Sequence, residues 1–286
     1  VFSKPYSYSP SMVGDASITP SFGLKPYGST NENFAFRGVG IEVDEIPLGR
    51  VRLRLISGFS RVRLDARIED GRVVSLPSSG YHRTAGEVAT RDALREDAIA
   101  LCVQLASGLW HTGFNMYLSS FDQDFDGEAI PWIKGKSNQV ASLDFSLRKS
   151  GANLSAEGAI SNSGGKSGIV SVGIQGEKAE VAVVLRKYGE LLRSVHSNPF
   201  SSYSDPRGEE GVYLRAVLKP LKIGRLHISN DVQRRVRSGV LSSKGSQTLL
   251  RIDLNMERVD LTLSAKVTGK ETLLSLIHIS EPTRLG

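Results

Sequence analysis

The chain has 286 residues, of which 40% are apolar and 23% charged, and its formal net charge is +6. This length is enough for one large β domain or two ordinary domains. No run of about 18 or more apolar residues occurs, which excludes a transmembrane helix. Barrel strands escape such a search, because only every second residue in them is apolar. The single cysteine, Cys102, excludes an internal disulfide framework.

The two ends of the chain differ from the rest of it. Residues 1–33 are rich in Ser, Pro, Gly and Tyr and show no periodicity, which predicts a loop. The chain begins at Val1 without a Met or a signal peptide, so we expect it to be a fragment of a longer metagenomic reading frame. Residues 275–286 (SLIHISEPTRLG) resemble a translated sequencing adapter. We therefore expect the native domain to cover residues 34–274.

Apolar and polar residues alternate strictly in several segments, most clearly in 141–148, 250–257 and 261–267. Successive strand side chains point to opposite faces, so each segment has one apolar face and one polar face. With turn signals such as Ser107-Gly108 and Ser150-Gly151, the pattern predicts roughly twelve strands. The predicted strands are 34–43, 50–68, 98–106, 109–121, 139–149, 153–161, 168–175, 179–188, 211–220, 224–231, 248–258 and 260–268.

Tight turns alternate with longer links at 122–138, 189–210 and 232–247. Short turns at one end and long loops at the other are typical of an all-β, antiparallel, up-and-down transmembrane β-barrel. We therefore predict a barrel in the bacterial outer membrane, in contact with its lipid. The apolar face of 50–68 changes after Gly58, which predicts a bulge or turn there. The alternative is a soluble β-sandwich that binds carbohydrate, in which the apolar faces converge on one core.

One segment, 75–97, lacks alternation and predicts a helical insertion. Thr84 and Glu87 match a capping box, which marks the start of a short helix. Tyr81, His82 and Arg83 precede it. They are candidates for a plug that contacts a lumen carboxylate or a passing ligand, or for a helix cap with a buried hydrogen-bond network.

Basic residues on the early strands are the other candidates in the lumen. Arg52 and Arg54 fall on the predicted polar face, as do Arg61, Arg63, Asp65 and Arg67. An arginine cluster selects anions or binds phosphate groups. The alternative is a packed lumen, in which these arginines pair with carboxylates of other strands. Such carboxylates are Asp144, Glu157, Asp253 and Glu257.

Asp122, Asp124 and Asp126, followed by Gly127, match the opening of a calcium-binding loop. Alternate carboxylates let oxygens converge on one hard cation. The full motif requires Glu at its twelfth position, where this chain has Ile133. The alternative is an acidic extracellular loop. Ca²⁺ is thus the only cofactor that the sequence suggests.

The sequence predicts no enzyme. It contains no G-x-S-x-G motif, and Gly164-Gly165-Lys166-Ser167 lacks the upstream glycine of a phosphate-binding loop. An outer-membrane protease or phospholipase would need a Ser/His/Asp set on strand ends, a geometry that spacing alone does not reveal.

Three segments carry a resemblance to a family. They are KPYGSTNENFAFRG (25–38), SSGYHRTAGEVATRDALRE (78–96) and HSNPFSSYSDPRGEEGVYL (196–214). They resemble the barrel part of outer-membrane helix-hairpin-helix proteins of the Bacteroidetes and Chlorobi type. The resemblance implies a barrel preceded by competence-like DNA-binding modules, which are absent from this chain. Contact with DNA would come only through such a module. The implied role is a pore, a plugged barrel or a membrane anchor.

Overall fold

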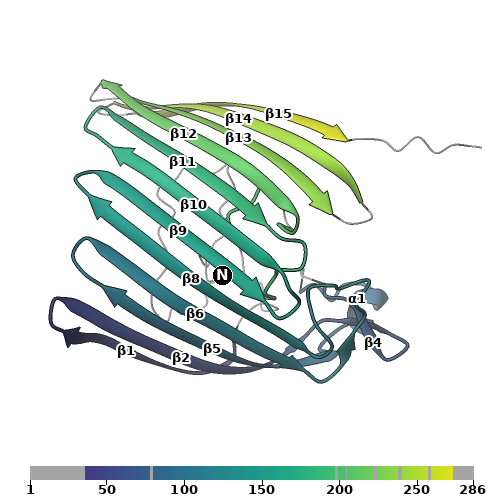
Figure 1. Cartoon of the computed structure of the whole chain (residues 1–286). Helices are drawn as coiled ribbons and strands as arrows, with labels where there is room; N and C mark the ends of the chain where they lie inside the picture. Colours follow the sequence, from purple (N-terminus) through teal and green to yellow (C-terminus); the bar gives the residue numbers. More distant parts are fainter. Residues whose placement is uncertain are drawn as a thin grey trace, which may run out of the picture.

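The computed structural model describes residues 36–77, 80–196, 199–203, 205–221, 224–237, 240–256 and 259–272. The predicted loop 1–33 and the tail 275–286 lie outside these residues. The described chain is almost entirely antiparallel β structure, as predicted, and its main sheet has twelve strands (Figure 1). Each strand of this sheet pairs with the next in chain order, which is up-and-down topology.

Each of the twelve strands overlaps one predicted segment, and the largest difference in bounds lies at 232–247. The strands are β1 (Gly38–Leu48), β2 (Val51–Leu64), β5 (Leu94–Ala106), β6 (Trp110–Phe121), β8 (Ser137–Lys149), β9 (Ala152–Ser161), β10 (Lys166–Gln175), β11 (Ala179–Tyr188), β12 (Glu209–Leu221), β13 (Gly224–Arg237), β14 (Val240–Met256) and β15 (Val259–Thr272). A second, three-stranded sheet contains β3 (Arg67–Glu69), β4 (Arg72–Ser75) and β7 (Asp124–Phe125). Among the described residues the large sheet is not closed, and β1 and β15 form its edges.

The two ends of the sheet differ in their connections. At the left of Figure 1, which we call end A, turns such as 107–109 and 150–151 join neighbouring strands. At the opposite end, end B, the connections include 65–93, 122–136 and 189–208. The predicted asymmetry is therefore present. The predicted link 232–247 is wrong, because β13 and β14 continue through most of it as a paired hairpin.

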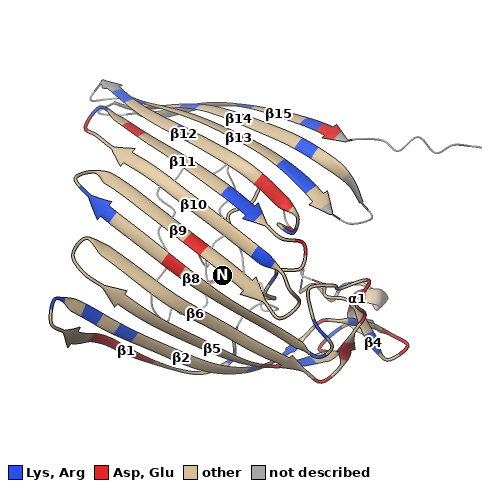
Figure 2. Cartoon of the chain, viewed as in Figure 1, with Lys and Arg blue, Asp and Glu red and all other residues tan. Residues whose placement is uncertain are grey.

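The sheet has an apolar outer face and a polar inner face. Each of the twelve strands exposes a large apolar side chain on the outer face. One example from each strand, in order, is Val39, Leu55, Ile99, Phe114, Leu143, Ile160, Val172, Val181, Val212, Ile228, Leu250 and Leu263. The inner face carries buried polar residues, among them Glu96, Asn115, Asp144, Ser155, Arg186, Glu209 and Asp231. Figure 2 shows that Lys, Arg, Asp and Glu occupy few positions in the middle of the strands.

The predicted bulge or turn at Gly58 is wrong. Strand β2 pairs with β5 without interruption from Arg52 to Leu64. Leu55 faces outward, whereas Val62 and Leu64 face inward and are buried. The apolar pattern therefore changes face because the surroundings of the strand change along its length, while its register stays the same. The irregularity in this hairpin lies in β1, between Val43 and Ile46.

A hydrophobic core covers the inner face at end B and explains the buried half of β2. The connections fold back onto the sheet here, so that their apolar residues pack against strand residues. The core contains Val62, Leu64, Ala66, Val73, Leu94, Phe121, Phe125, Ile130, Trp132, Ile133 and Val195. This end of the inner face is thus filled by protein.

The predicted helical insertion is present but shorter than 75–97, and it forms helix α1 (Ala85–Ala89). None of its residues is buried, and it lies beyond the strand ends at end B (Figure 1). The predicted capping box is confirmed: the Glu87 N–H donates to Thr84 Oγ1, and the Thr84 N–H donates to Glu87 Oε2. No helix in the described ranges is long and apolar enough to cross a membrane.

We expect the start of α1 to loosen in acid. The N–H groups of Arg83 and Thr84 donate to Glu87 and hold the pKa of that carboxyl below its usual range. A lowered pKa stabilises the fold above the ordinary Glu value, and this contribution is lost as pH falls through the folded value. Hydrogen-exchange protection of residues 83–90 should therefore fall between about pH 6 and about pH 3. The Glu87→Gln variant should lack this pH dependence, and an identical dependence in that variant would contradict the assignment.

Candidate functional site

The connection between β11 and β12 is described at 189–196, 199–203 and 205–208; these residues lie across the inner face, and we call them the strap. The carbonyl of Leu191 accepts hydrogen bonds from Ser161 and Ser163, at 3.0 and 2.6 Å. The carbonyl of Arg193 accepts one from Asn138 Nδ2 at 3.0 Å. These partners lie on β9, in the turn after it and on β8. The strap therefore leaves β11 and passes over strands that precede it in the sheet.

The strap reaches β5 through a buried hydrogen bond between His196 and Glu96. His196 Nε2 lies 2.7 Å from Glu96 Oε2, and the two side chains are 4% and 0% exposed. Ser119 donates to the other carboxylate oxygen of Glu96 at 2.6 Å, and so does the hydroxyl of Tyr117. The ring of Phe36 lies 4.2 Å from the imidazole of His196. Residues 100 positions apart in the chain are joined here, although four strands of the sheet lie between β5 and β11, after which the strap begins.

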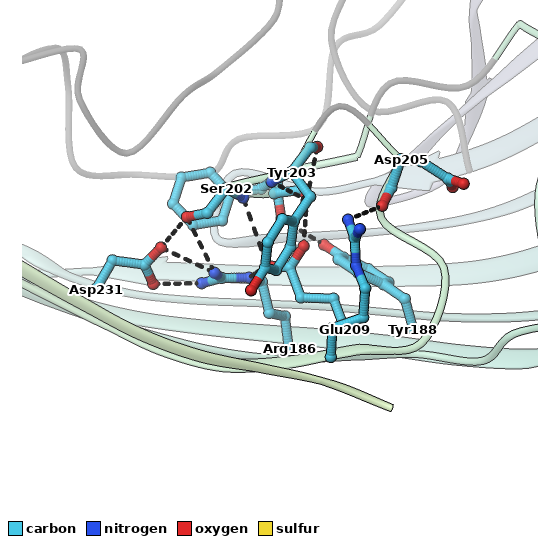
Figure 3. A network of polar contacts seen from close by, with 10 residues as sticks. Arg186, Tyr188, Ser202, Tyr203, Asp205, Glu209 and Asp231 are labelled. Atoms are coloured by element: carbon cyan, nitrogen blue, oxygen red, sulfur yellow. Dashed lines mark hydrogen bonds and ion pairs between the residues drawn. The ribbon is translucent and has the colours of Figure 1, made fainter. Parts of the chain in front are cut away.

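A second buried cluster fixes the strap near β11 to β13, and Figure 3 shows it. Arg186 Nε donates to Glu209 Oε1 at 2.6 Å, and its Nη1 and Nη2 donate to the two oxygens of Asp231 at 2.8 and 2.9 Å. The three side chains are 0–1% exposed. Since they come from three adjacent strands, the cluster ties β11, β12 and β13 together.

Strap residues complete the hydrogen bonds of both carboxylates. The hydroxyl of Ser201 donates to Glu209 Oε2, and that of Ser202 donates to Asp231 Oδ2. With the arginine bonds, all four carboxylate oxygens have a donor. The Phe200 ring lies 5.3 Å from the Arg186 guanidinium. This cluster is thus a satisfied network, which is the condition for burying charge in a protein interior.

A glycine on the neighbouring strand makes room for the guanidinium. Gly211 is the partner of Arg186 across β11 and β12. A Cβ added to Gly211 would lie 2.7 Å from Arg186 Cζ. Sequence reasoning did not single out Arg186, Glu209 or Asp231. The available signals were the position of Glu209 inside the segment 196–214 and the positions of Arg186 and Asp231 near the ends of the predicted strands 179–188 and 224–231.

The predicted residues before α1 lie elsewhere, at end B. His82 Nε2 lies 2.9 Å from Asp65 Oδ2, so it fastens this segment to the residue after β2. The guanidinium of Arg83 lies 3.9 Å from the centre of the Tyr81 ring, and Tyr81 is exposed. The structure therefore places Tyr81, His82 and Arg83 around the helix start, and it does not bring them to the strap.

The two predicted lumen arginines lie on the inner face near end A and pair with β1. Arg54 donates to both oxygens of Asp44, at 2.6 and 2.5 Å. Arg52 Nη1 donates to Glu45 Oε1 at 2.9 Å. These acids are not the ones that the sequence suggested.

The prediction that Arg61 and Arg63 share the polar face of Arg52 and Arg54 is wrong. Arg61 is the partner of Asp97 on β5, on the outer face, and binds its carboxylate at 2.5 Å. The reason is the change of surroundings along β2, which reverses the face that carries its polar residues.

The structure does not bring the three aspartates of the predicted calcium loop together. Asp122 Oδ1 accepts the N–H of Arg95 at 2.9 Å, and Asp124 lies 3.6 Å from Lys136. The N–H groups of Ala129 and Glu128 hold the pKa of Asp126 below its usual range. No cluster of three His, Cys, Asp or Glu side chains able to share a metal ion occurs within the described ranges.

No protein-family model matches the chain, and no curated protein matches it at a significant level. The resemblance to helix-hairpin-helix membrane proteins therefore stays a prediction. The site is assigned from its geometry alone.

We expect Arg186→Leu to destabilise the protein by about 3–5 kcal/mol, because it leaves two carboxylates buried without their cation. Lys187→Leu is the matched control, since Lys187 is 77% exposed and pairs with Glu210 at the surface. Its expected cost is at most about 1 kcal/mol. Urea unfolding of the folded protein in detergent micelles measures both. Equal midpoints for the two variants would contradict a supporting role of the Arg186 cluster.

Proposed function

We propose that this chain forms the wall of a β-barrel in the bacterial outer membrane, plugged by its own strap. The observation that carries the proposal is the outer face. Apolar residues from all twelve strands are exposed there, and Leu143, Ile174 and Val267 are 64, 64 and 70% exposed. Water-soluble monomers rarely expose apolar patches larger than a few hundred Å². Membrane lipid is the partner that would cover this face.

The soluble sandwich fits the geometry less well. In a sandwich, the apolar faces of two sheets meet and form the core. Here the apolar residues of the large sheet point outward, and the strap packs against the opposite, polar face. A lipid surface therefore explains the outer face better than a carbohydrate ligand does.

Charged pairs on the outer face lie near end B. Arg61 pairs with Asp97, and Glu210 pairs with both Lys187 and Arg234. These residues lie toward end B of their strands, next to the apolar band. The arrangement fits a membrane–water boundary at end B. In bacterial outer-membrane barrels the long loops are extracellular and the short turns periplasmic, so we propose this orientation.

The edges of the sheet allow closure. β1 runs toward end A and β15 runs away from it, so the two edges are antiparallel to each other. An even number of antiparallel strands closes without a parallel pair. Closure removes unpaired backbone groups from hydrocarbon, where each costs several kcal/mol. We propose that β1 and β15 meet in the membrane.

The strap decides between an open and a plugged barrel. It crosses the inner face from β11 to β5, where His196 is hydrogen-bonded to the buried Glu96, and its Ser201 and Ser202 bind the buried carboxylates of Glu209 and Asp231. We therefore favour a plugged barrel or an anchor over a wide open pore. A link to DNA rests on the family resemblance alone and stays a prediction.

Leu143→Arg tests the lipid contact. If lipid covers the outer face, an arginine at mid-strand should cost about 2–4 kcal/mol in folding from urea into lipid vesicles. In a soluble protein this exposed position would tolerate arginine with a change of about 0.5 kcal/mol or less. Gln139→Arg is the matched control, since it lies on the same face of β8 near end B. Equal, small effects of both substitutions would rule out the membrane proposal.

Cysteine pairs test closure. In a Cys102→Ser background, Ile41→Cys on β1 is combined in turn with cysteines at Leu261, Leu263, Ala265 and Val267 on β15. We expect one pair to form an intramolecular disulfide in the membrane-inserted protein, because a disulfide requires Cα atoms within about 7 Å. Non-reducing gels and mass spectrometry detect it. Cross-links that are exclusively intermolecular would show that the edges bind other strands.

A further inference from the structure

The inner face carries a third polar cluster, close to end A. His111 on β6 and Ser146 on β8 are direct partners across the two strands. The hydroxyl of Ser146 is hydrogen-bonded to His111 Nδ1. His111 Nε2 lies 3.0 Å from Asp144 Oδ1. The three side chains thus form a continuous chain from a hydroxyl through an imidazole to a carboxylate.

The carboxylate determines what the imidazole can do. A carboxylate only accepts hydrogen bonds, so the Nε2 of a neutral His111 carries the proton that Asp144 accepts. His111 Nδ1 is then an acceptor, and the hydroxyl of Ser146 donates to it. This is the arrangement of a serine with its general base. The two ring nitrogens are exchanged relative to the serine-protease template, but either nitrogen accepts a proton when the other carries one.

Asp144 is itself held in place. Asn115 Nδ2 donates to Asp144 Oδ2 at 2.8 Å, so both carboxylate oxygens are used. Gly113 is the partner of Asp144 on β6, and a Cβ there would lie 2.4 Å from Asp144 Oδ2. The carboxylate therefore lies over the glycine. Asn115 and Gly113 act as positioning residues for Asp144, and Asp144 acts as a positioning residue for His111.

The buried cluster around Glu96 shows that this order is not a general feature of the inner wall. There the serine, Ser119, and the histidine, His196, both bind the carboxylate of Glu96. In that cluster the histidine is not placed to take the proton of the serine. His111, in contrast, is placed to take the proton of Ser146.

We infer that Ser146 is a nucleophile that hydrolyses carboxylic esters on the inner wall. Ser146 Oγ forms a bond to the acyl carbon, and its proton moves to His111 Nδ1. The bond from the acyl carbon to the alcohol oxygen then breaks, and the alcohol leaves with that proton. Water attacks the acyl-serine in the same way, giving its proton through His111 to Ser146 and releasing the acid. The sum is ester plus water to acid plus alcohol.

The surroundings indicate where the substrate enters and what charge it carries. Ser146 is half-buried and lies near the last residues of β8, on the side of the turn at 150–151. Arg148 is the next residue of the same face toward end A, and it is exposed. An exposed arginine beside the path favours an ester that bears an anionic group. This inference rests on the inner wall alone and does not depend on the membrane proposal.

The test uses the full chain, folded in detergent, and a fluorophosphonate probe. The probe should label Ser146, as located by peptide mass spectrometry. Ser146→Ala should abolish the labelling, and His111→Gln should slow it about 10²-fold or more because the general base is lost. Ser155→Ala is the matched control, since Ser155 is the partner of Ser146 on β9 and is buried on the same face. It should label like the unaltered chain.

Turnover is followed with p-nitrophenyl esters, one neutral and one carrying a carboxylate. We expect the rate of ester hydrolysis to change in the same order as the rate of labelling across the variants. Arg148→Gln should raise the KM of the anionic ester without a matching change in the KM of the neutral ester. β-type circular dichroism shows that each variant is folded. A folded, unlabelled wild-type chain, or equal labelling of Ser146→Ala, would overturn the inference.

Discussion

The structure depends on one constraint: successive side chains of a strand point to opposite faces. In a single sheet with an apolar outer face, most polar side chains in the middle of the strands are directed inward. Buried there, each polar group needs a hydrogen-bond partner, because leaving one unpaired costs about 1–3 kcal/mol. The clusters around Arg186, Glu96 and His111 are three solutions to the same problem. An apolar outer face is therefore enough to require such clusters, whether or not the inner face has a function.

The strap is the part of the chain that makes the largest of these clusters complete. Arg186 alone gives one positive charge against the two carboxylates of Glu209 and Asp231. The serine hydroxyls of the strap supply the missing donors without adding charge. The sheet therefore stabilises the strap, and the strap in turn removes an electrostatic cost from the sheet. This mutual dependence explains how the described strap residues, which have little regular structure, pack against a polar face.

Local pattern was sufficient to predict the twelve strands of the large sheet and the start of α1, because alternation, turn residues and the Thr84–Glu87 capping box act within a few residues. Local pattern gave the wrong face for the residues of β2 after Gly58, because the surroundings change along that strand. It also missed the strand residues at 232–247, because the strands continue there with polar residues. Local pattern could not predict the polar clusters, for a different reason. His196 and Glu96 are 100 residues apart, and only the register of the sheet and the path of the strap bring them together. The spacing of Asp122, Asp124 and Asp126 suggested convergence, but turn geometry directs each to a different partner.

The clusters share one device but differ in what they leave reactive. In two of them a polar side chain lies over a glycine of the next strand, Arg186 over Gly211 and Asp144 over Gly113. Around Arg186 each carboxylate oxygen has a donor, and both serines donate to carboxylates, which are weak bases. Around His111 the serine donates to an imidazole, the side chain that most often serves as a general base in catalysis. The supporting cluster and the reactive cluster therefore differ in one group, the acceptor of the serine hydroxyl, which is a carboxylate in the first and an imidazole in the second.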